Sequence, residues 1–275
     1  ICQVPDIVFG NMPNDDNGKL SKYDNLQRQE IIKNYPDSEE LFKKFLGADE
    51  FINNRERWCL WLVGVSPNKI SKIPPVYNAV QKVRISRLNS TRAGTKKQAD
   101  TPHLFGEIRQ PNTEYILIPR HSSANRRYIP MGYVSPDIIC GDSNLLIPNA
   151  TLFHFGVLTS DVHMAWVRTV CGRLKSDYRY SKDIVYNNFP WCDPTPEQKA
   201  KIEKTAQAIL DARAKYSDCS LADLYDETTM PSELRKAHQL NDKVVMQAYG
   251  FDYKTMTESE CVAELMKMYK ELTNN

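Results

Sequence analysis

Apolar residues along the chain fall into short runs and into helical periods. Residues 58–63 form a continuous apolar run, which predicts a buried strand. Residues 115–119 and 128–134 are apolar segments bounded by proline and glycine, and they are also typical of strands. Three further segments carry apolar residues at helical spacing and predict helices, namely 37–46, 76–92 and 161–174.

After residue 193 the pattern becomes helical throughout. Thr195 followed by Pro196 and Gln198 is a helix start with a capping box. Further helix starts are predicted at Ser220, Pro231 and Thr257. The expected fold class is therefore α+β, with a mixed α/β domain at 1–193 and a small all-α helical domain at 194–275.

Composition places the chain among ordinary globular proteins. Of its 275 residues, 41% are hydrophobic and 25% are charged, and no apolar run has the length of a membrane span. The seven cysteines are scattered and never form C-x-x-C, which disfavours disulfides and zinc and favours a reducing cytoplasm. The first residue is Ile within an apolar segment, so we expect a piece of a longer protein.

The charge is unevenly distributed. Residues 80–182 hold 15 Lys and Arg against 7 Asp and Glu, a net charge of +8, whereas the whole chain carries only +2. A basic middle within an otherwise acidic chain is typical of a surface that binds a polyanion. A solvated basic face without a partner is the alternative.

One stretch looks like a catalytic signature. Asn188-Phe189-Pro190-Trp191 follows residues 183–185, an apolar run expected to be a strand, much as an Asn-Pro-Pro-aromatic loop follows a strand in amino-methyltransferases. Phe189 replaces the first proline, and the chain has no G-x-G turn for S-adenosylmethionine. Glu197 and Lys199 have nuclease spacing but lie in the first turn of a capped helix. We therefore expect no catalytic residue and no metal site in this chain.

Two stretches have the composition of a nucleic-acid surface. Residues 120–128 and 172–181 are dense in Arg, Lys, Ser, Asn and Tyr, which hold phosphates and read base edges. Lys175 and Asp177 are two residues apart and point to the same side if the chain is extended. Together they can read one G·C pair, the lysine donating to guanine and the aspartate accepting from cytosine. A plain surface ion pair explains the spacing equally well.

Several longer motifs carry a family resemblance. They are Gly10–Asp15, 57–61, 122–130, 147–151, 163–168, 172–191 and 220–225. With them the chain resembles, over nearly its full length, the C-terminal part of the MmeI-like single-chain type II (type IIG) restriction–modification enzymes. In these enzymes a restriction endonuclease is fused to an N6-adenine DNA methyltransferase. The resemblance implies a target-recognition domain followed by a helical C-terminal domain, which read double-stranded DNA in the major groove.

The resemblance also implies which residues read bases. The family positions matching Lys175 and Asp177, and those matching Arg120 and Asp142, vary together with the base that is read. A cation with an acid predicts a G·C pair at each of the two positions. Ser143 and Arg179 match a further reading position, whose base we leave unassigned. Phosphate contacts are expected from three arginines of the basic stretches, Arg126, Arg127 and Arg173.

The parent protein, by the same resemblance, requires S-adenosylmethionine and Mg²⁺, whereas this chain is expected to hold no cofactor. Its partners are then double-stranded DNA and the methyltransferase and nuclease domains of the same parent chain, without a membrane. Two other classes of function remain open, a catalytic methyltransferase fragment that uses the Asn188 loop and a protein-interaction module. The first requires binding of S-adenosylmethionine, and the second requires indifference to DNA.

Overall fold

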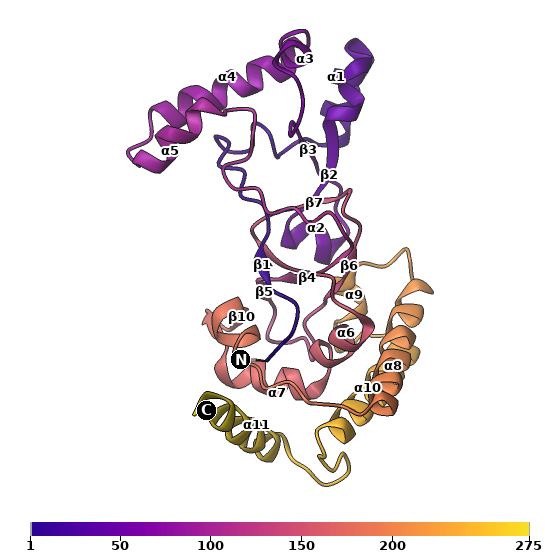
Figure 1. Ribbon diagram of the computed structural model, residues 1–275. Coiled ribbons are helices and arrows are strands. Elements are labelled where there is room, and N and C mark those ends of the chain that lie inside the picture. Colours follow the sequence, from indigo (N-terminus) through magenta and orange to yellow (C-terminus); the bar gives the residue numbers. More distant parts are fainter. Residues whose placement is uncertain (1, 275) are drawn as a thin grey trace.

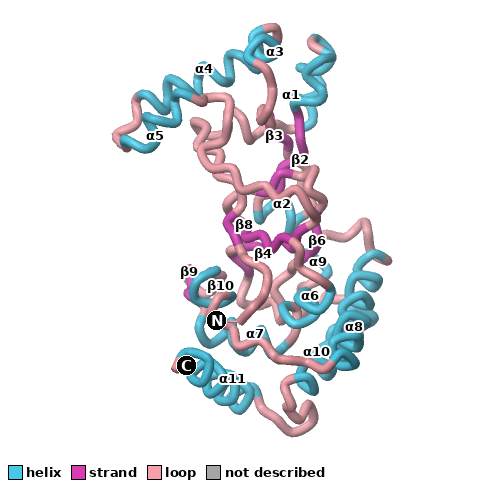
Figure 2. Tube along the Cα trace, viewed as in Figure 1, coloured by secondary structure: helices cyan, strands magenta, loops and turns pink. Residues whose placement is uncertain are grey.

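The computed structural model describes residues 2–274 and has three parts along its length. Figure 1 shows a helical arm at the top, a small sheet in the middle and a larger body of helices at the bottom. Figure 2 shows that most helices lie at the two ends and that strands are concentrated between them. The mixed α/β composition with a helical C-terminal region confirms the predicted α+β class.

The central sheet has four antiparallel strands in the order β1-β8-β4-β6. The strands are β1 (Val8–Phe9), β4 (Tyr115–Pro119), β6 (Gly132–Val134) and β8 (Asn144–Pro148). Every residue of β4 is buried, as expected of a central strand that is covered on both faces. The strand predicted at 115–119 is confirmed. Of the segment 128–134 only the last three residues form a strand, because Tyr128, Ile129 and Met131 leave the sheet and enter the helical core.

The arm has its own small sheet and its own core. Strand β2 (Phe42–Leu46) pairs antiparallel with β3 (Trp58–Leu60) and parallel with β7 (Ile139–Cys140). The helix predicted at 37–46 is therefore wrong: a 3-10 turn, η1 (Pro36–Leu41), leads into β2. The two neighbouring strands satisfy the backbone of β2, and this long-range pairing overrides the local helical pattern.

Five short or medium helices complete the upper half of the chain. They are α1 (Asn25–Asn34), α2 (Ala48–Asn53), α3 (Pro67–Ser71), α4 (Pro74–Leu88) and α5 (Ala93–Lys97), the last followed by a 3-10 turn, η2 (Gln98–Asp100). Helix α4 confirms the helix predicted at 76–92, although it ends four residues earlier. Val76, Val80 and Val83 of α4 are buried against the small sheet and fix the helix to it.

The lower body contains six helices. They are α6 (Leu152–Leu158), α7 (Asp161–Val170), α8 (Pro196–Ala214), α9 (Leu221–Leu224), α10 (Ser232–Ala248) and α11 (Glu258–Thr273). The helix starts predicted at Thr195, Ser220 and Thr257 are all formed, and each has a capping box. Helix α7 ends at Val170 rather than at 174, because the chain turns there into a hairpin.

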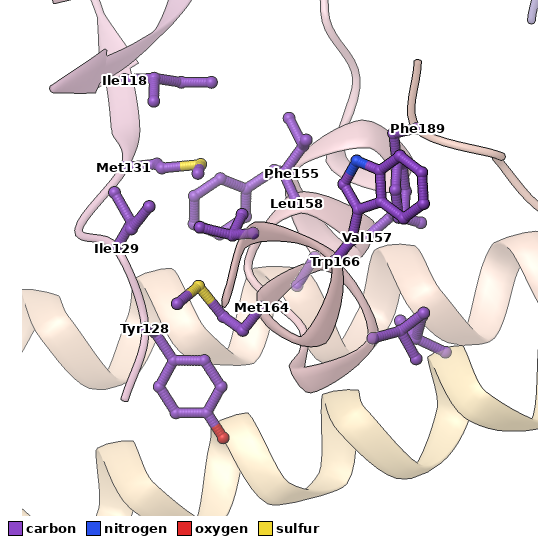
Figure 3. Close-up of a cluster of buried hydrophobic side chains, with 14 of the residues drawn as sticks. Ile118, Tyr128, Ile129, Met131, Phe155, Val157, Leu158, Met164, Trp166 and Phe189 are labelled. Atoms are coloured by element: carbon purple, nitrogen blue, oxygen red, sulfur yellow. The ribbon is translucent and has the colours of Figure 1, made fainter. Parts of the chain in front are cut away.

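One continuous core runs through this body. It joins residues from the sheet, from α6 and α7 and from the C-terminal helices, so that buried Phe155 and Trp166 share a cluster with Ile202 and Leu265. Figure 3 shows Met131, Phe155 and Met164 pointing into this cluster from three different segments. Residues before and after 193 therefore build the same hydrophobic core.

No helix within residues 2–274 combines the length and the apolar character that crossing a bilayer demands.

Candidate nucleic-acid interface

The stretch 172–181 forms a hairpin on the surface. Strands β9 (Gly172–Leu174) and β10 (Asp177–Arg179) pair with each other, and β10 also pairs with β5 (His121–Ser122). Side chains alternate along β10, so Tyr178 is buried while Asp177 and Arg179 are exposed. The Tyr178 side chain thus anchors the hairpin in the core, and the side chains of Asp177 and Arg179 point to solvent.

Lys175 lies in the two-residue turn of this hairpin. Its φ of 56° is in the left-handed region, so the chain is not extended between Lys175 and Asp177. The condition under which both side chains would share the face of one extended strand is therefore not met. Lys175 and Ser176 form the turn, and Asp177, the first residue of β10, follows Ser176.

Asp177 holds the adjacent loop in place. Its Oδ1 accepts a hydrogen bond from the backbone N–H of Ala124 at 3.2 Å. Within residues 2–274 no donor occupies Oδ2, so the exposed carboxylate keeps an acceptor available for a ligand. Ser123 and Ala124 belong to the other basic stretch, and this contact therefore joins the two stretches that the sequence singled out.

Arg120 and Asp142 also lie together. Arg120 Nη1 donates to the backbone carbonyl of Asp142 at 3.0 Å, and Arg120 N donates to the carbonyl of Ser143 at 3.0 Å. The carbonyl of Arg120 in turn accepts from Tyr180 N at 2.8 Å, which continues the β5–β10 ladder. These hydrogen bonds set the second cation–acid pair beside the hairpin that carries the first.

Phe9 is a part of this region that the sequence did not reveal. The Arg120 guanidinium lies 4.9 Å from the centre of the Phe9 ring, and Arg109 and Lys182 each lie 5.9 Å from it. An aromatic face surrounded by three cations restrains them by cation–π attraction. Phe9 is part of an ordinary apolar segment, and nothing local in V-F-G signals that role.

Ser143 has a structural contact in addition to its predicted one. Its Oγ accepts from Ala48 N at 2.9 Å and so satisfies a free N–H at the start of α2. The hydroxyl proton stays available as a donor. Arg179, the other member of the predicted reading position, is exposed and lies opposite His121 across the β5–β10 ladder.

The electrostatic environment at His121 reflects the surrounding cations. Burial lowers the pKa of His121, and the positive charges of Arg120 and Arg179 lower it further, whereas Asp177 raises it. A histidine with this lowered pKa stays neutral near pH 7. The local field is therefore positive, as attraction of a polyanion requires.

The three arginines predicted to bind phosphates have different surroundings. Arg173 stacks on the Tyr178 ring at 4.1 Å and donates from Nη1 to the Ser176 carbonyl at 3.0 Å, so it stiffens the hairpin while remaining exposed. Burial lowers the pKa of Arg126, against the opposing charge of Asp177. Both lie at the hairpin.

Arg127 is engaged elsewhere. It makes a two-point ion pair with Asp161, with Nη2–Oδ2 at 2.5 Å and Nε–Oδ1 at 3.3 Å. This hydrogen bonding raises the pKa of Arg127. A guanidinium fully paired with a carboxylate at the start of α7 favours a structural role over phosphate binding.

The stretch that looks like a methyltransferase loop is part of the core. Residues 182–186 form a π-helical turn, η3 (Lys182–Tyr186), so the strand predicted at 183–185 is wrong. Phe189 is fully buried against His163, with ring centres 4.6 Å apart, and Figure 3 shows it beside Trp166. Trp191 is buried as well, so its ring is not free to stack on a base. The stretch closes the core.

Metal ligands do not converge in the part of the chain that the structure describes: residues 2–274 contain no group of three or more His, Cys, Asp or Glu side chains arranged to hold an ion.

Comparison with known proteins covers the whole chain. Residues 1–193 match the family described as "MmeI, target recognition domain", and residues 194–275 match "MmeI, C-terminal domain". DNA methyltransferase A of Bacillus subtilis (strain 168) is 38% identical over 273 residues, which are 99% of this chain and 31% of that protein. A solved structure of the type IIL restriction–modification enzyme MmeI in complex with DNA is 44% identical, with a TM-score of 0.96 over 100% of this chain and 36% of that chain. The chain thus spans about a third of the length of each.

Proposed function

Because the chain belongs to the MmeI family, as its target recognition domain followed by its C-terminal domain, we propose that it selects the DNA sequence on which a longer restriction–modification protein acts. Both similar proteins support this proposal, one by its name as a DNA methyltransferase and the other by its complex with DNA. The proposed partner is double-stranded DNA. Methyltransferase and nuclease domains of the same longer chain are the proposed internal partners.

One observation carries the proposal. The β9–β10 hairpin exposes Lys175, Asp177 and Arg179 while the buried Tyr178 fixes it to the core, and Arg120 with Asp142 lies at its base. A two-stranded ribbon of this kind fits the major groove of B-DNA. The exposed donors and acceptors are then the groups that meet base edges.

The chemistry of these groups determines the expected bases. A lysine or arginine donates to guanine O6 and N7, and an aspartate accepts from cytosine N4. Lys175 with Asp177 therefore reads one G·C pair, and Arg120 with Asp142 reads a second, with guanine facing the cation each time. Arg179 and Ser143 serve a third position. Arg126 and Arg173 position the backbone, whereas Arg127 is left out of the proposed site because of its ion pair with Asp161.

The chemistry of methyl transfer and cleavage lies, in this proposal, outside residues 1–275. S-adenosylmethionine and Mg²⁺ would be used by the other domains of the complete protein. The chain described here contributes orientation: it holds the duplex in one register so that those domains meet a defined adenine and a defined phosphate.

The test exchanges one cation–acid pair in the complete protein. In the double variant Lys175→Asp and Asp177→Lys the donor and acceptor change places, so the preferred pair at one position should invert from G·C to C·G. Sequencing of methylated DNA maps the site for each protein. A wrong base at one position typically costs ~1–3 kcal/mol, so the preference should change by about 5- to 150-fold.

A matched control inverts an exposed pair on α11. Glu264 and Lys267 form an ion pair there, and Glu264→Lys with Lys267→Glu should leave the mapped site unchanged. If the hairpin variant also keeps the wild-type site, the assignment of Lys175 and Asp177 is wrong. If wild-type protein neither retards DNA in a gel at low salt nor loses binding steeply as salt rises, the function is protein interaction instead.

A further inference from the structure

One segment of the arm, residues 57–99, carries an unusually one-sided charge. Between Glu56 and Asp100 the sequence has nine Lys and Arg and not a single Asp or Glu, although acids make up 34 of the 275 residues. Like charges crowded on a small domain repel one another and destabilise it unless they have partners. Some of the nine side chains have ion-pair or hydrogen-bond partners within the described part of the chain, residues 2–274, and the others do not.

Three of the nine have clear structural partners. Arg57 pairs with Glu50 at 2.9 Å, and Lys69 pairs with Glu40. Arg87 is buried. The other six are exposed, and none of them forms an ion pair within residues 2–274: Lys72, Lys82, Arg84, Arg92, Lys96 and Lys97.

Buried Arg87 makes the tip of the arm rigid. Its guanidinium donates to five backbone carbonyls at 2.8 to 3.1 Å, three in the segment that follows α5 (residues 98, 101 and 104) and two in the loop at residues 13 and 14. Helix α5 and its exposed cations are thereby tied to α4 and to the 10–14 loop. That loop follows directly after Phe9, and the Arg120 guanidinium lies over the Phe9 ring. The arm tip and the proposed base-reading region are therefore parts of one connected scaffold.

The tip also faces the appropriate side. In Figure 1 and Figure 2, α5 and the β9–β10 hairpin both lie at the left margin of the molecule, above and below the central sheet. A duplex that meets the hairpin along this side passes the tip of the arm.

The residue types of α5 favour phosphate over protein. Arg92, Lys96 and Lys97 surround Ala93 and Gly94, and a side chain added at Gly94 would meet only open space. Small residues between cations allow a phosphate to approach the main chain. Helix α4 differs, because Tyr77, Ile85 and Leu88 are exposed on it and suit an apolar partner. We therefore confine the inference to α5.

We propose that Lys96 and Lys97 of α5, together with Arg92 directly before it, bind the sugar–phosphate backbone of the recognised DNA, away from the bases that the hairpin reads. This anchor is independent of sequence. The proposal rests on the proposed function, because it needs DNA along the side of the molecule that carries the hairpin. It adds a second contact region at the opposite end of the folded part formed by residues 2–193 (Figure 1).

The test is a triple variant of the complete protein, Arg92→Gln, Lys96→Gln and Lys97→Gln. Binding is measured by fluorescence anisotropy over a salt series, on a duplex that contains the mapped site and on one with the site scrambled. Each phosphate contact contributes ~0.9 to the slope of log K against log salt, so the slope should become shallower by about 2 to 3. Affinity should fall by the same factor on both duplexes, and the mapped site should not change.

The control removes the same charge elsewhere. Lys201, Lys204 and Lys215 are exposed on α8 and just after it, on the right of Figure 1, and their change to Gln should leave the slope at its wild-type value. Equal slopes for the α5 variant and wild type would overturn the inference, as would a loss of affinity confined to the mapped site. Failure of the proposed function looks different: wild-type protein itself would then show no preference between the two duplexes.

Discussion

Arg120 owes its position to contacts that lie far apart in the sequence. Its guanidinium stacks on Phe9, donates to the Asp142 carbonyl and keeps Nε buried without a partner. A guanidinium held in this way loses little side-chain entropy when it meets a base, and such preorganisation increases discrimination. Phe9 is therefore a positioning residue for the base that Arg120 reads in the proposed function.

Substitution of Phe9 by Leu tests this role. Leucine keeps an apolar side chain in β1 but removes the aromatic face, so the cation–π restraint is lost. We expect the preference at the base read by Arg120 to weaken by about 3- to 30-fold, corresponding to ~0.5–2 kcal/mol. The preference at the base read by Lys175 should stay as it is, and methylation-site mapping measures both. An equal loss at both bases would point to general damage of the sheet instead.

At the scale of elements, the β9–β10 hairpin combines a strained residue with the exposed surface that is proposed to read bases. Lys175 has a left-handed backbone in the turn, a conformation that costs a residue with a side chain ~1–2 kcal/mol relative to its ordinary regions. Glycine adopts it freely. The presence of lysine at a position suited to glycine favours a function for its ammonium group over a contribution to stability.

Comparison of Lys175→Gly with Lys175→Ala separates the two effects. Both variants lose the ammonium group and should lose base preference at that position to the same extent. Only the glycine variant relieves the backbone, so its free energy of unfolding should exceed that of the alanine variant by about 1 kcal/mol in chemical denaturation. Equal stabilities would show that the turn relaxes without cost.

Elements that depend on local signals could be predicted from the sequence. Thr195, Ser220 and Thr257 cap helices because each hydroxyl meets a backbone N–H three residues later. Strand β2 and the turn η3 could not be predicted in this way. Strand β2 depends on pairing with other strands, and η3 depends on the burial of Val185 and Tyr186. The proposed reading residues were recognisable by type, whereas the ion pair of Arg127 and the ring of Phe9 depend on partners distant in sequence.

At the scale of the whole molecule, Asp242 on α10 links the two halves of the chain. Its Oδ2 accepts from the Tyr128 hydroxyl at 2.6 Å, and its Oδ1 accepts from Asp161 N at 2.8 Å. Burial, and secondly the charge of Asp161, raise the pKa of Asp242 from its ordinary 3.8 to about 8. The interface between the halves therefore holds a carboxyl group that prefers to be protonated.

The raised pKa predicts how stability changes with pH. Between pH 3.8 and about 8 the folded chain keeps a proton on Asp242 that the unfolded chain has lost, so this group's contribution to stability falls as pH rises through that window. Asn mimics the protonated carboxyl. The stability of Asp242→Asn relative to wild type should therefore rise by ~1 kcal/mol per pH unit in chemical denaturation at pH 5, 6.5 and 8.

Subtracting the wild-type free energy of unfolding at each pH cancels the contributions of the other titrating groups. Burial lowers the pKa of His163 to about 3 and lowers that of His238 strongly, and these shifts act in the opposite direction. The variant Asp218→Asn is the control, because it removes one negative charge at an exposed position. A pH-independent difference between Asp242→Asn and wild type would contradict the assignment.

The core shared across residue 193 limits how such proteins diversify. Gly156 of α6 lies so close to α8 that an added Cβ would come within 2.7 Å of Ile202, and Arg213 donates across the same junction to the Met131 carbonyl. A chimaera that took residues 1–193 from one relative and 194–275 from another would have to fit two independently drifting surfaces into one close-packed interior. Point changes on the solvent-facing side of the hairpin disturb none of that interior. If the hairpin reads bases as proposed, a new base preference is therefore reached more readily by substitution on it than by exchange of segments.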